Sequence, residues 1–263
     1  YETQCEGRKE YYVIGVHVLG GDKYNCATWI TMKRFDQITK WIAQAQRTLI
    51  SPKIMDLTII YFNSKDIGDI EVDILKEYVN PQIKLLDLSN NSICAKGATL
   101  LGMNNSWTNL RKLILSCNNV GVEGATALAK NKSWVNLTLL DLSENMVGDE
   151  GAAELAKNNS WVKLTELNLS MNNIGDEGAA ALGNNVSWTN LARLSLTFNK
   201  IGEKGAKALS ANISWNLEFL ELETIGMDLG EGRNAILNRW PTIRNKDLLM
   251  CFFRFIHRLD SDT

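Results

Sequence analysis

The sequence has few residues of the kinds that enzymes use at metal and nucleophile sites. It contains two histidines and five cysteines, and none of them shows C-x-x-C or cysteine–histidine spacing. No serine lies in a nucleophile elbow, G-x-S-x-G. The sequence therefore predicts no catalytic residue, no metal site and no cofactor, and we expect a protein that is not an enzyme.

Long runs of one chemical kind are also missing. Basic residues never cluster enough to neutralise a row of phosphates, which argues against a nucleic-acid partner. The apolar stretches are short and interrupted by charge, so we expect no membrane span. The odd number of cysteines, without paired spacing, indicates free thiols and therefore a reducing, cytoplasmic compartment.

What the sequence does have is a Ser-Trp pair repeated every 27 residues. The five tryptophans are Trp107, Trp134, Trp161, Trp188 and Trp215. A period of this length indicates an array of stacked repeats, and such arrays build extended surfaces that usually bind macromolecules. We expect each ring to be buried and to stack on its neighbours. The alternative is a row of exposed aromatic rings that stack on glycans or bases.

Asn-x-Ser triplets recur with the same period. They begin at Asn104, Asn131, Asn158, Asn185 and Asn212. In a secreted eukaryotic protein such triplets would be acceptors for glycans. We interpret them instead as one copied part of the repeat, since they keep their place relative to each tryptophan.

The repeats share the pattern L-x-x-L-x-L-x-x-N followed by I-G-x-E-G-A-x-x-L-A. Clear copies begin at Leu110, Leu137, Leu164 and Leu191, a weaker copy begins at Ile83, and a degenerate one contains Ile60. This is the pattern of a leucine-rich repeat, and its second half resembles the ribonuclease-inhibitor-like subclass that NOD-like receptors also contain. The resemblance covers roughly residues 55–225. It implies an α/β fold, a curved solenoid with a parallel sheet on the concave face, helices outside and a cap at each end.

The residues of each copy support this fold independently. Leu140 and Leu142 alternate with Asp141, so the leucines should point inward and the aspartate outward. The asparagine that ends the pattern, such as Asn145, should satisfy backbone groups in the turn after the strand and form a ladder with its equivalents. Gly148 should allow a tight turn into the helix that follows.

The pattern also predicts three parts of the chain. Residues 1–54 should form an N-terminal α/β cap or small subdomain, residues 55–228 the solenoid, and residues 229–263 a C-terminal helical cap. Two helices are expected in the last part, over 230–240 and 244–259. The second helix should seal the last repeat, and its alternative role is an amphipathic helix for a membrane or a partner.

Positions three, five and eight of the pattern differ between copies, which is expected if they recognise a partner. Among them are three large apolar groups that a folded monomer should expose, an arginine beside them, and three carboxylates towards the N-terminal side. The predicted partner-binding residues are Phe198, Met171, Phe219, Arg193, Glu166, Asp141 and Glu144. Apolar groups and arginine with a charged rim are typical of protein-binding sites. For Phe219, packing against the C-terminal cap is the alternative.

These observations predict a monomeric, non-enzymatic protein–protein interaction scaffold. The near-identical copies resemble repeat arrays of intracellular bacteria and protists, which implies an effector that acts in the host-cell cytosol after secretion. The chain lacks the abundant cysteines and strong acidity of ribonuclease inhibitor itself. The alternative function is regulation of an enzyme, for example as a GTPase activator or inhibitor. An activator needs an arginine on a loop at the solenoid edge, and neither Arg111 nor Arg193 is expected there.

Overall fold

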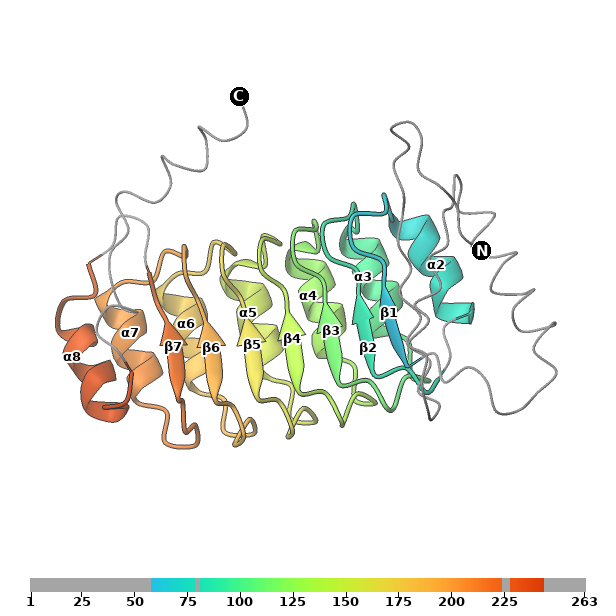
Figure 1. The fold of residues 1–263 in the computed structure, drawn as a ribbon. Helices are drawn as coiled ribbons and strands as arrows, with labels where there is room; N and C mark the ends of the chain where they lie inside the picture. The colour runs from blue at the N-terminus through green and yellow to red at the C-terminus, as the bar shows by residue number, and fades with distance from the viewer. Residues whose placement is uncertain (1–57, 79–80, 224–227, 244–263) are drawn as a thin grey trace, which may run out of the picture.

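The computed structural model describes residues 58–78, 81–223 and 228–243. Within them, seven parallel strands form one open sheet in chain order, and the helices lie together on one side of it (Figure 1). This confirms the predicted α/β solenoid. The predicted N-terminal segment 1–54 and the second C-terminal helix, 244–259, lie outside the described residues, and the predicted part boundaries stay a prediction.

Each repeat contributes one short strand and one short helix. The strands are β1 (Ile59–Tyr61), β2 (Leu85–Asp87), β3 (Lys112–Ile114), β4 (Leu139–Asp141), β5 (Glu166–Asn168), β6 (Arg193–Ser195) and β7 (Phe219–Glu221). The helices are α2 (Asp69–Tyr78), α3 (Ala95–Gly102), α4 (Gly121–Ala129), α5 (Gly148–Ala156), α6 (Asp176–Gly183), α7 (Glu203–Ser210) and α8 (Gly230–Arg239).

The core lies between the sheet and the helices, as the leucine spacing predicts. The middle residue of each strand is buried and pairs in register with the middle residue of the next strand, as Leu140 does with Leu167. Leu142 is fully buried as well, whereas Asp141 is partly exposed on the other face of the sheet. The degenerate first copy follows the same rule, because Ile60, at the centre of β1, is buried.

The tryptophans are buried in every copy, which confirms their predicted structural role. Stacking is more restricted than predicted, because Trp161 and Trp188 are the one stacked pair within the described residues, with ring centroids 6.5 Å apart. The indole N–H of Trp188 donates to the carbonyl oxygen of Asn158 at 3.1 Å. The indole N–H groups of the other four tryptophans have no partner in the described part of the chain.

The asparagine that ends each strand pattern forms the predicted ladder. The Oδ1 atom of Asn172 accepts hydrogen bonds from the backbone N–H groups of Asn145 and Val147, at 3.2 and 3.0 Å. Its Nδ2 atom donates to the carbonyl oxygens of Leu142 and Ser170. Since Asn145, Val147 and Leu142 belong to the preceding repeat, each rung of the ladder joins two repeats and satisfies buried backbone groups of both.

A second asparagine ladder runs through the Asn-x-Ser triplets. Asn158 is 1% exposed, and its Nδ2 atom donates to the carbonyl oxygens of Ala129 (2.7 Å) and Asn131 (2.9 Å) in the preceding repeat. Its Oδ1 atom accepts from the N–H groups of Ser160 and Trp161. The triplet therefore fixes the turn before each strand, and its amide nitrogen is occupied rather than available to a glycan.

The start of several helices is capped by an aspartate from the preceding repeat. Asp149 Oδ1 accepts the N–H groups of Gly175 (2.6 Å) and Gly178 (2.9 Å) at the start of α6. A Cβ atom on Gly178 would lie 2.5 Å from this oxygen, so the cap requires glycine there. Val122, the equivalent residue one repeat earlier, cannot accept these bonds. The following helix instead starts with Gly148 at φ +65°, a left-handed conformation that glycine adopts without a steric penalty.

The C-terminal end continues the array with a degenerate helix, α8, which agrees with the predicted helix over 230–240. Arg239 lies 27 residues after Asn212, and its Nε atom donates to the carbonyl oxygen of Asn212 at 2.9 Å. In three of the earlier repeats an asparagine 27 residues further along the chain makes the same contact, as Asn212 does to the carbonyl oxygen of Asn185. Arg239 therefore ends the second ladder.

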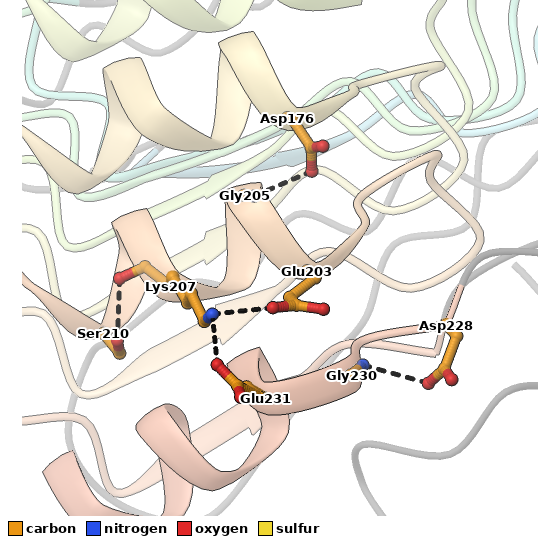
Figure 2. Close-up of polar contacts among 8 residues, drawn as sticks. All are labelled: Asp176, Glu203, Gly205, Lys207, Ser210, Asp228, Gly230 and Glu231. Carbon is orange, nitrogen blue, oxygen red and sulfur yellow. Dashed lines mark hydrogen bonds and ion pairs between the residues drawn. The ribbon is translucent and has the colours of Figure 1, made fainter.

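An ion-pair cluster joins α7 to α8 (Figure 2). The ammonium group of Lys207 contacts Glu203 Oε1 at 2.6 Å and Glu231 Oε2 at 2.7 Å. The hydrogen bonds to the two carboxylates raise the pKa of Lys207, and the hydrogen bond from Lys207 lowers the pKa of Glu231. All three side chains are well exposed, so the cluster contributes only modestly at physiological salt.

Replacing Asn158 with alanine should destabilise the fold far more than replacing its exposed neighbour Asn159. Asn158→Ala leaves buried carbonyl and N–H groups unpaired, which costs about 2–4 kcal/mol of unfolding free energy. Asn159→Ala should change it by less than about 0.5 kcal/mol. Chemical denaturation of both variants measures the difference. Equal losses would show that the second ladder does not stabilise the array.

The Lys207–Glu231 contact should make part of the stability depend on pH. A carboxyl whose pKa is lowered by folding stabilises the folded state above its unfolded pKa, and this stabilisation is lost as the pH falls through the folded pKa. Chemical denaturation at pH ~7 should therefore give a higher free energy of unfolding for the wild type than for Glu231→Gln, and this difference should disappear below pH ~4. The control is Glu150→Gln, which removes one carboxylate at an exposed position on α5. A difference that persists in acid would contradict this assignment.

Candidate protein-binding surface

The exposed side of the sheet carries the side chains of positions three, five, seven and eight of each repeat, and we call this surface the sheet face. The two outer residues of each strand lie on it, because the middle residue points into the core. In β5 these are Glu166 and Asn168, on either side of the buried Leu167. Helices cover the opposite side of the sheet, so the sheet face is not packed against them (Figure 1).

Position three brings three of the predicted site residues together. The strand register pairs Glu166 with Arg193, and Arg193 with Phe219. Arg193 Nη1 lies 3.6 Å from Glu166 Oε2, and the two side chains are 57% and 40% exposed. An exposed pair at this distance contributes at most about 1 kcal/mol, so both groups remain available to a partner. Phe219, 40% exposed, lies beside them.

Polar side chains at positions five and seven form a strip across the sheet face from Asp141 to Glu221, which we call the polar strip. In its C-terminal part, Ser170 Oγ lies 2.8 Å from Ser195 Oγ, which donates to Glu221 Oε2 at 2.7 Å. Further towards the N-terminus, Asp141 Oδ1 accepts the N–H and hydroxyl groups of Ser143. Asp141 is therefore partly exposed, as predicted, but it also accepts hydrogen bonds that hold the turn after its strand. Hydrogen bonds between its own side chains hold the polar strip in place.

Position eight has a backbone constraint that the sequence did not reveal. Glu144, Met171 and Phe198 have φ angles of +58°, +54° and +56°, and the equivalent Asn90 and Cys117 have the same left-handed conformation. The variation at position eight predicts a position that folding constrains little, and the left-handed backbone shows that this expectation was wrong. Met171 and Phe198 are half-buried, so their predicted exposure is only partial.

The left-handed conformation at position eight shows which side chains the backbone alone would favour there. Glycine and asparagine adopt it most readily, whereas for other residues it costs about 1–3 kcal/mol. The weaker second copy has the favourable residue, Asn90, but the later copies have Met171 and Phe198. Backbone preference therefore does not explain the methionine and phenylalanine, which points to a role for their side chains.

The predicted site residues form two groups rather than one patch. Phe198 follows Arg193 by five residues, so their Cα atoms lie at most roughly 16 Å apart in an extended chain. Arg193, Glu166 and Phe219 lie at the strands, and Met171 and Phe198 lie in the turns after them. The polar strip with Ser195 and Glu221 separates the two apolar groups. A single partner would have to cross the strands to contact both.

The sheet face carries an excess of negative charge. On positions three, five, seven and eight of β1 to β7, six acidic residues accompany two basic ones, Lys112 and Arg193. The acidic residues are Asp87, Asp141, Glu144, Glu166, Glu221 and Glu223. Sequence reasoning missed Glu221 and Glu223 as site residues, although Glu221 follows Asp141 along position five. The surface therefore favours a positively charged protein segment over another acidic one.

The described residues contain no cluster of histidine, cysteine, aspartate or glutamate that could hold a metal ion. No helix within them is long and apolar enough to cross a membrane. Two of the five cysteines, Cys94 and Cys117, are described, and the exposed Cys94 is a free thiol.

Comparison with protein families identifies the repeat unit. Four consecutive segments, 108–129, 135–156, 162–183 and 189–210, match the family model described as leucine-rich repeat. These four segments are leucine-rich repeats. Each match runs from the turn after a tryptophan through one strand and one helix, so the family unit coincides with the structural repeat.

Among solved structures, the chain is similar to actin-binding site 2 of leiomodin-1, with 19% sequence identity and a TM-score of 0.39. The alignment covers 64% of this chain and 95% of that one. A search of curated proteins gave no match. Leucine-rich-repeat arrays are in general non-enzymatic folds that bind proteins.

Two substitutions at position 198 should separate backbone strain from side-chain packing. Both Phe198→Ala and Phe198→Asn remove the ring, but asparagine tolerates the left-handed conformation better. We therefore expect Phe198→Asn to be more stable than Phe198→Ala by about 1 kcal/mol. Urea denaturation of the two variants gives this difference. Equal stabilities would mean that position 198 does not strain the folded chain.

Proposed function

We propose that this leucine-rich repeat protein is a binding scaffold that holds a protein partner on its sheet face, around Phe198 and Arg193. The observation that carries the proposal is the left-handed backbone of Met171 and Phe198, where folding favours glycine or asparagine. Natural proteins keep locally unfavourable residues mainly where function uses them.

The composition of the surface supports the same proposal. Phe219 is exposed, Arg193 is 57% exposed, and the nearby acidic residues provide a charged rim. Aromatic, methionine and arginine side chains are enriched where proteins bind one another, and a few of them usually provide most of the binding free energy. Glu166, Asp141 and Glu144 complete the proposed surface on its N-terminal side.

The cysteines and the near-identical repeats bear on the compartment in which the protein works. We propose that the protein is a monomer, and that it works in a reducing, cytoplasmic compartment because the exposed Cys94 is a free thiol. A role as an effector in the host-cell cytosol rests on the resemblance of the near-identical repeats to arrays of intracellular microbes. Regulation of a GTPase has no observation in its favour: Arg193 lies within β6 and pairs with Glu166, and Arg111 directly precedes β3.

The double variant Phe198→Ala, Arg193→Glu tests the proposed surface. Partners captured by the wild-type protein from a native lysate are identified, and their affinity is then measured by calorimetry with purified proteins. We expect the double variant to lose about 2–4 kcal/mol of binding free energy, or roughly 30- to 1000-fold in Kd.

A matched control makes the same kinds of change away from the sheet face. Met103→Ala, Lys130→Glu removes an exposed apolar side chain and reverses one charge after helices α3 and α4. The control should bind like wild type, and both double variants should keep the wild-type circular dichroism spectrum. Equal affinities of the two double variants would place the binding site elsewhere on the protein.

A further inference from the structure

We infer that the occupant of the sheet face is an extended segment of another protein with two apolar side chains on either side of a lysine or arginine. The inference rests on the proposed function and adds the chemistry of the partner. It follows from the order of groups across the strands, from Phe219 and Arg193 through the polar strip to Met171 and Phe198.

The two apolar groups fix the spacing of the segment. Phe219 lies at the start of β7, while Phe198 lies in the turn that follows β6. Phe219 pairs with Arg193 on the neighbouring strand, about 4.8 Å away, and Phe198 lies at most roughly 16 Å from Arg193 along the chain. The two apolar groups are therefore at most roughly 17 Å apart across the sheet face, which an extended chain covers with about five residues. An apolar side chain at one end of such a stretch can contact Phe219, and one at the other end can contact Phe198.

The carboxylates between and beside the apolar groups fix the charge of the segment. Asp141, Glu144, Glu221 and Glu223 have no ion-pair partner within the described residues. Glu221 Oε2 already accepts the hydroxyl of Ser195, which holds the carboxylate on the polar strip. A lysine or arginine side chain placed over this strip would find acceptors that the protein itself leaves without a cation.

The backbone of the segment would face hydroxyl and amide groups rather than apolar atoms. Asn168, Ser170 and Ser195 line the same strip and are partly exposed. Small polar side chains of this kind leave room for a main chain to approach and can hydrogen-bond to it. An acidic segment or a nucleic acid would instead meet the uncompensated carboxylates.

Selection from a random 16-residue peptide library, displayed on phage, tests the inference on the full-length protein. Peptides that bind the wild type should be enriched in lysine and arginine, with apolar residues four or five positions apart. Against Glu144→Lys, Glu166→Lys, which leaves equal numbers of acidic and basic residues on the sheet face, the same selection should lose the enrichment in lysine and arginine. Glu150→Lys, Glu177→Lys makes the same change on exposed parts of α5 and α6 and should select the wild-type kind of peptide.

The double variant Met171→Asn, Phe198→Asn distinguishes a failure of this inference from a failure of the proposed function. Wild-type-selected peptides should bind this variant at least tenfold more weakly in fluorescence anisotropy. Peptides that need Met171 and Phe198 but show no basic excess would overturn the inference and leave the proposed function standing. Peptides that bind every sheet-face variant equally would overturn both, and a selection that enriches nothing would overturn the inference.

Discussion

The fold depends on asparagine side chains that reach from one repeat to the one before it. A repeat of 27 residues spends most of its length in two tight turns, and the backbone groups of those turns are buried and cannot be satisfied by water. Asn172 satisfies groups in the turn after the strand, and Asn158 satisfies groups in the turn before it. Because each amide bonds to two repeats, neighbouring repeats hold each other's turns in place, and the leucines and tryptophans can pack between sheet and helices.

Much of this fold could be predicted from the sequence because it is encoded locally and then copied. Alternation around Leu140 identifies the buried side of a strand, and the recurrence of Trp161 at a fixed spacing indicates a structural ring. Other features depend on contacts between repeats that no single copy contains. The burial of Asn158 could not be distinguished from a glycan acceptor, and Arg239 takes the place of an asparagine without any resemblance to it.

The candidate surface was predicted only in part, for a related reason. Variation between copies selected residues that share the exposed face of the sheet, since Arg193, Glu166 and Phe219 lie side by side. It did not reveal the left-handed backbone at Phe198, because phenylalanine is not a residue that signals this conformation. That conflict between residue and backbone is the strongest indication that the surface serves a partner, and it became visible only in the structure.

Hydrogen exchange of Asn172→Ala, measured residue by residue, tests the coupling of repeats most directly. The amides of Asn145 and Val147, more than 20 residues away in sequence, should lose more protection than the amides in the repeat of Asn172 itself, because Asn172 Oδ1 accepts their hydrogen bonds. Loss of protection confined to the repeat that contains Asn172 would contradict this coupling.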